Sequence, residues 1–78
     1  SLFSASQSFF EALENLSKME IPKELEGFHK SEMIIIGGLG YAFQKLASTN
    51  DPDEAVVLIY AIQELSETQE EIINLLTK

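Results

Sequence analysis

Residues 34–43, IIIGGLGYAF, constrain the fold more than any other part of this 78-residue chain. Three isoleucines run directly into a group of three glycines, Gly37, Gly38 and Gly40. Such a run is compatible with a strand that feeds a phosphate-binding loop, with part of a membrane span, or with a helix against which another element packs closely. The three interpretations imply three different proteins, and the rest of the sequence decides between them.

Neither a dinucleotide-binding loop nor a membrane span fits the run. Gly38 and Gly40 match the first two glycines of the dinucleotide motif, but the third position is Phe43, which is too large for close helix packing. The second strand of such a fold would fall near residues 57–62, inside the strongest helical pattern of the chain. The apolar run 33–43 is about half of the ~20 residues that a membrane helix needs. We therefore expect no direct membrane insertion by this segment.

A helix accounts for the glycine run best. A helical period gives it two stripes, with Met33, Ile36, Gly37, Gly40 and Ala47 on one and Ile35, Leu39, Ala42 and Leu46 on the other. Each helical glycine costs about 1 kcal/mol relative to alanine, so close packing should offset that cost. The expected helix-packing or interface residues are Gly37, Gly38, Gly40 and Ala42. They would meet Phe9, Phe10 or Tyr60 of the same chain, or the same helix of a second subunit.

Helix signals lie on both sides of this segment. Residues 4–7, SASQ, have the pattern of a capping box, and apolar residues at helical spacing follow as far as residue 20. Pro22 fits the start of a second helix, and Asp51 and Pro52 fit the cap and first position of a third. The sequence thus predicts one all-α domain, residues 1–78, with helices at 4–20, 22–48 and 52–77. Short turns between them favour an antiparallel up-down-up three-helix bundle with the apolar second helix at its centre.

Charge and composition exclude several functions. Thirteen acidic residues face five lysines and no arginine, for a net charge of −8. Such a field repels nucleic acid and anionic membrane surfaces. The chain has no cysteine for a disulfide or thiolate metal site, and its serines lie far in sequence from its single histidine. We therefore expect no enzyme, no cofactor and no metal, and a protein partner or a second copy of the chain (a homodimer) as the binding partner.

His29 has three sharper interpretations. Glu26 and His29 form an E-x-x-H pair, as found in di-iron helical bundles. Residues 28–47 also resemble histidine phosphotransfer domains, acidic bundles in which a histidine is followed by a lysine and a leucine–glycine pair. Lys30 and the pair Leu39-Gly40 carry this resemblance, while Met33 stands in place of a glycine. Phosphotransfer or metal binding through His29 is the alternative function.

A third pattern resembles small helical envelope proteins of bacteria. It consists of P-x-x-L-x-x-x-H at residues 22–29, followed by D-P-x-x-A at residues 51–55. The resemblance implies an extracytoplasmic domain, anchored by a segment outside this chain. In it, a hydrogen bond from His29 would tie down the connection between the first two helices. The expected role is a structural or protein-interaction module.

Overall fold

A computed structural model describes residues 1–77 and shows three α-helices, with no strand among those residues. Helix α1 spans Leu2–Lys18, α2 spans Glu26–Ser48 and α3 spans Pro52–Leu76. A short 3-10 helix, η1, covers Lys23–Leu25 immediately before α2. The prediction of an all-helical chain with three α-helices is confirmed.

The first helix begins earlier than the sequence pattern indicates. Ser1 is the N-cap, and its hydroxyl accepts a hydrogen bond from the amide of Ser4 at 3.2 Å. Ser4 therefore lies inside the helix, and the predicted capping box with Gln7 is wrong. Several serines near the terminus could cap a helix. Ser6 is the one that tertiary structure uses, because its hydroxyl donates to the carbonyl of Gly40.

The starts of the other two helices differ in how well local signals define them. The amide of Leu25 donates to the Pro22 carbonyl at 2.9 Å, which closes a 3-10 turn, so α2 begins at Glu26 and not at residue 22. At α3 the carboxylate of Asp51 accepts from the Asp53 amide at 2.9 Å, and Pro52 is the first helical residue. The predicted start of the third helix is confirmed.

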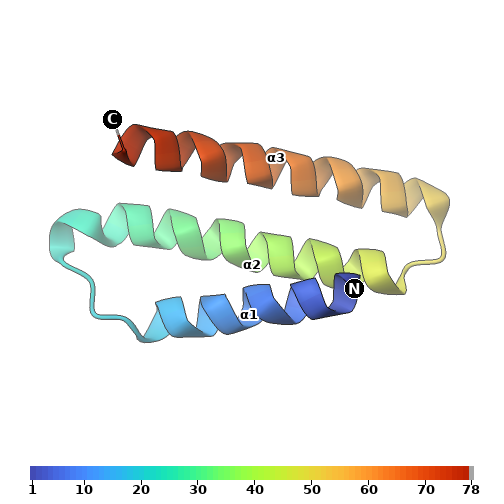
Figure 1. Ribbon diagram of the computed structural model, residues 1–78, viewed down its shortest axis with the longest axis horizontal. Coiled ribbons are helices and arrows are strands. Elements are labelled where there is room, and N and C mark those ends of the chain that lie inside the picture. The colour runs from blue at the N-terminus through green and yellow to red at the C-terminus, as the bar shows by residue number, and fades with distance from the viewer. Residues whose placement is uncertain (78) are drawn as a thin grey trace.

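Helix α2 lies between the other two, and the two connections lie at its opposite ends (Figure 1). Both α1 and α3 pack on α2, but no Cα of α1 lies within 8 Å of a Cα of α3. The molecule measures 43 × 25 × 17 Å along its principal axes. The three helices therefore form an open layer rather than a closed triangle.

The buried residues follow one stripe of α2. Ile35, Leu39 and Ala42 are the buried hydrophobic side chains among residues 1–77, and α3 contributes none. Beside this stripe, Ile34 is 72% exposed and Tyr41 is 56% exposed. Helix α2 is thus covered where α1 and α3 pack on it and open to solvent elsewhere.

The chain is less compact than its length leads one to expect. Its radius of gyration is 13.8 Å, whereas a compact domain of this length has about 11.5 Å. Its accessible surface is 5709 Å², whereas a folded monomer of this mass exposes about 4,700 Å². The open layer leaves about 1,000 Å² more surface in contact with solvent than a typical monomer does.

Candidate functional site

Gly40 is the point of closest approach between α1 and α2. A Cβ atom at this position would lie 3.1 and 3.2 Å from two ring carbons of Phe10 and 3.2 Å from the Cβ of Phe9. The Ser6 hydroxyl, which is buried, donates to the Gly40 carbonyl at 3.0 Å. The ring of Phe9 then stacks on Phe43, with 5.5 Å between ring centroids. The predicted packing of a phenylalanine from the same chain against the glycines is confirmed here.

The other two glycines of the run have looser neighbours. A Cβ at Gly38 would lie 3.1 Å from a terminal methyl of Leu65 on α3, and a Cβ at Gly37 would lie 3.4 Å from Leu13 on α1. All three glycines thus have partners within the chain. Tyr60, the third predicted aromatic partner, is exposed and lies near none of these positions.

His29 joins the start of α2 to the end of α1. Its Nε2 lies 2.7 Å from the Leu16 carbonyl oxygen, which also accepts from the Met19 amide at 3.3 Å. Because a carbonyl only accepts, the ring nitrogen is the donor. The hydrogen bond expected at the connection between the first two helices is present, and it occupies Nε2. Within residues 1–77, no three His, Cys, Asp or Glu side chains come close enough together to hold a metal ion.

A hollow of about 210 Å³ lies beside this hydrogen bond, between the end of α1, the connection and the start of α2. The partly exposed side chains Met19, Leu25 and Phe28 form its rim, while Leu16 and Ile21 lie deeper. The wall is apolar. This hollow, called the connection hollow below, is also lined by His29 and Glu32.

Glu32 is a site residue that the sequence interpretation missed. Glu32 is only 8% exposed, and its Oε1 is buried without a hydrogen-bond partner. A signal was present: the buried stripe of Ile35, Leu39 and Ala42, continued one turn backward, arrives at Glu32. Gln69 Oε1 on α3 is likewise buried and has no partner. Both atoms are acceptors that would gain from an N–H or O–H donor.

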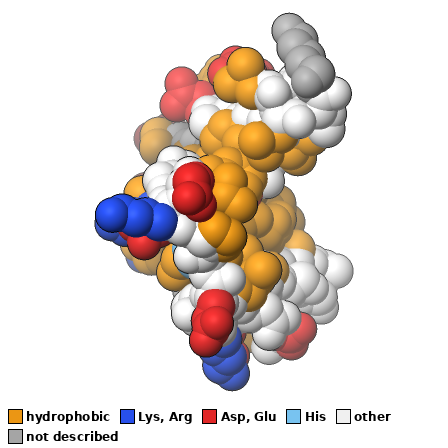
Figure 2. Space-filling model, turned by 90° about the vertical axis from the view of Figure 1, so that its left-hand side faces the viewer, with side chains coloured by type: hydrophobic (Ala, Val, Ile, Leu, Met, Phe, Trp, Pro, Cys, Tyr) orange, Lys and Arg blue, Asp and Glu red, His pale blue; other side chains and the backbone are white. Residues whose placement is uncertain are grey.

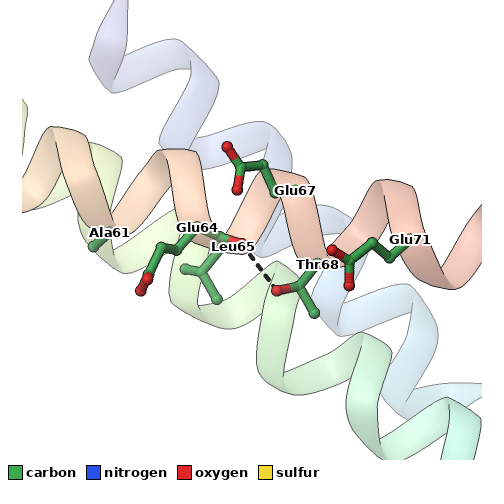
Figure 3. A pocket seen from close by; sticks show the side chains of 6 residues that line it. All are labelled: Ala61, Glu64, Leu65, Glu67, Thr68 and Glu71. Carbon is green, nitrogen blue, oxygen red and sulfur yellow. Dashed lines mark hydrogen bonds between the residues drawn. The ribbon is translucent and has the colours of Figure 1, made fainter.

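A second, wider hollow of about 510 Å³ lies along α3 alone (Figure 3). Its floor includes Ala61 and Leu65, and three glutamates surround it: Glu64, Glu67 and Glu71. The hydroxyl of Thr68 donates to the Glu64 carbonyl at 2.9 Å. Six acidic residues and no lysine or arginine lie within α3. This surface is open and strongly negative.

Large hydrophobic side chains remain exposed on all three helices. They are Leu2, Phe3, Phe10, Met19, Leu25, Phe28, Ile34, Tyr41, Val56, Val57, Ile59, Tyr60, Ile73, Leu75 and Leu76. Figure 2 shows hydrophobic side chains over much of the end of the molecule where α1 connects to α2, with both acidic and lysine side chains among and around them. A patch of this kind is typical of a surface that another molecule covers.

No family model, curated protein or solved structure matches the chain. The resemblances to bacterial envelope proteins and to phosphotransfer domains therefore stay predictions. No helix within residues 1–77 combines the length and the apolar character needed to cross a membrane.

Proposed function

We propose that this chain is a non-enzymatic protein-interaction module, an up-down-up three-helix bundle whose apolar central helix is completed by a protein partner or by a second copy. The observation that carries the proposal is the excess accessible surface. The 5709 Å² of the chain exceeds the value for a monomer of this mass by about 1,000 Å². A standard interface buries about 800 Å² on each partner, so one interface would account for the excess.

The helix arrangement supports the same function. Since no Cα of α1 lies within 8 Å of a Cα of α3, the side chains of α2 are covered from fewer directions than in a closed bundle. Ile34 and Tyr41 project from one side of α2, two turns apart, and remain mostly exposed. Burying apolar surface of this kind drives most protein association. A covering partner would complete the core that the chain alone leaves open.

The charge of the chain favours a basic partner. A net charge of −8 with no arginine raises the association rate of cationic surfaces and disfavours nucleic acid. The resemblance to envelope proteins adds the proposal that the module works outside the cytoplasm of a bacterium, held by an anchor outside this chain.

Sedimentation velocity over a range of concentrations, together with binding of an apolar fluorescent dye, tests the function. We expect either self-association or a monomer that binds the dye. Replacing both Ile34 and Tyr41 by lysine should reduce that behaviour while helical circular dichroism is retained, because both side chains are exposed. A monomer that binds no dye at any concentration would refute the proposal.

The alternative role of His29 can be tested in the same samples. Incubation with a phosphodonor or with iron, followed by mass and absorbance measurements, would reveal phosphohistidine or bound metal. The hydrogen bond from His29 Nε2 to the Leu16 carbonyl would have to break for that nitrogen to react.

A further inference from the structure

The connection hollow has the size of a single large side chain. An apolar cavity of about 150 Å³ is known to take a benzene molecule, so about 210 Å³ accommodates a phenyl ring or a branched aliphatic group with room to spare. Its rim residues Met19, Leu25 and Phe28 are 56%, 46% and 36% exposed, so they already stand partly in solvent. Met19 is unbranched and flexible, which lets the rim adapt to an entering group.

A hydrogen bond joins the two helices beside the hollow. The hydrogen bond between His29 and the Leu16 carbonyl fixes the start of α2 against the end of α1, directly beside the lining side chains. A preformed hollow costs less to occupy than one that must first open. This site therefore differs from the open surface along α3, whose lining residues all belong to one helix.

Glu32 indicates what should accompany the apolar group. Its side chain is more than nine-tenths buried among the lining residues, and Oε1 lacks a donor. A buried carboxylate oxygen without a hydrogen bond is costly, and an ammonium or guanidinium group supplies the strongest donor. The net charge of the whole chain, −8, attracts the same kind of group at long range, while Lys18, Lys23 and Lys30 lie in the segments around the hollow.

We propose that the connection hollow, with Glu32 beside it, is the anchor site for a large apolar side chain on a basic helix of a protein partner. This proposal rests on the interaction function above and names its partner class. Residues three or four apart on a helix point the same way, about 5–6 Å apart. One turn of a partner helix can therefore deliver the apolar side chain to the hollow and a lysine or arginine toward Glu32, whose buried Oε1 is reached once the side chains around it move aside.

The probe is an alanine-rich helical peptide of about 16 residues with one phenylalanine and a lysine four positions later. A matched peptide carries norleucine in place of that lysine. Binding of both is measured by isothermal titration calorimetry to the full chain and to three variants. Met19→Lys obstructs the rim, Glu32→Gln removes the charge, and Val57→Lys makes the same charge change as the first at an exposed position of α3 that does not line the hollow. Circular dichroism confirms that each variant is folded.

We expect Met19→Lys to weaken binding of the lysine peptide roughly 10- to 100-fold, the value of burying one large apolar side chain. Val57→Lys should weaken it far less. The lysine peptide should bind the unmodified chain about 10-fold more tightly than the norleucine peptide, and Glu32→Gln should abolish that preference.

Equal losses in Met19→Lys and Val57→Lys, or a lysine preference that survives Glu32→Gln, would overturn the anchor site. The interaction function would then still stand if the peptides bind or the chain associates elsewhere. Loss of self-association in Met19→Lys without any peptide would show that a second copy is the occupant, which also overturns the proposed partner. A chain that binds neither peptide, and neither self-associates nor binds dye, would remove both proposals.

Discussion

Alanine substitutions in α2 separate crowded glycines from uncrowded ones. Gly40→Ala should destabilise the fold, because a methyl group there would meet the Phe10 ring at 3.1 Å and the Cβ of Phe9 at 3.2 Å. The Cβ of Phe9 is fixed to its backbone and cannot retreat without moving α1. Moving α1 would in turn stretch the 3.0 Å hydrogen bond from Ser6 to the Gly40 carbonyl.

The expected magnitude follows from opposing effects. Alanine gains about 1 kcal/mol of helix propensity over glycine. Forcing a methyl group into a packed contact costs about 1–3 kcal/mol, and weakening a buried hydrogen bond adds about 1 kcal/mol. The balance is a loss of about 1–3 kcal/mol in the free energy of unfolding. For a domain of this size each kcal/mol shifts Tm by about 4–8 °C.

Two control variants make the same glycine-to-alanine change at positions where the added methyl group has more space. Gly37→Ala places its methyl at an ordinary contact distance, 3.4 Å from Leu13, and Gly27→Ala meets nothing within 4 Å. Both should stabilise the helix, by up to about 1 kcal/mol. Gly38→Ala should lie between, since only a terminal methyl of Leu65 must turn away.

Urea unfolding followed by circular dichroism measures all four variants, with light scattering to confirm that the mass is unchanged. If Gly40→Ala proved as stable as Gly37→Ala, close packing could not be the reason for glycine at residue 40. A change of mass in Gly40→Ala would instead place that glycine in a contact between subunits.

Three further substitutions test single contacts by the same unfolding measurement. Asp51→Ala should lower the free energy of unfolding by about 1 kcal/mol, because it removes the cap on the Asp53 amide. Asn50→Ala should lower it less, and equal losses would mean that this cap contributes little. Gln69→Leu should stabilise the fold by about 1–2 kcal/mol or change its oligomeric state, because Oε1 is a buried acceptor without a donor; a large loss would show that its polar contacts matter. His29→Ala should cost about 1–2 kcal/mol through loss of the bond to Leu16, whereas an unchanged stability would make that bond incidental.

Local sequence signals predicted where the helices lie better than they predicted which residues of different helices contact each other. Asp51 and Pro52 define the start of α3 because cap and proline act within one turn, independently of the rest of the chain. The cap of α1 was predicted at Ser4 but is Ser1, and nothing in the sequence indicated that Ser6 bonds to α2. That contact joins residues 34 positions apart, so no local pattern could report it.

The site was less predictable than the fold for a related reason. The resemblance to envelope proteins implied a hydrogen bond from His29 at the connection, and His29 Nε2 bonds to the Leu16 carbonyl there. The sequence interpretation did not single out Glu32. Its burial depends on side chains from α1, the connection and α2 meeting around it, a tertiary arrangement that periodicity within one helix does not specify.

The lack of contact between α1 and α3 has a consequence for how the chain opens. Each outer helix packs on α2 separately, so the molecule consists of two helix pairs that share α2. Detaching α3 leaves the α1–α2 pair and its bond at His29 in place, and detaching α1 leaves the α2–α3 pair. Amide hydrogen exchange should therefore resolve two separately opening units, with the amides of α2 near Leu39 protected until both have opened. A partner that covers the open side of this layer would join the two units into one cooperative fold.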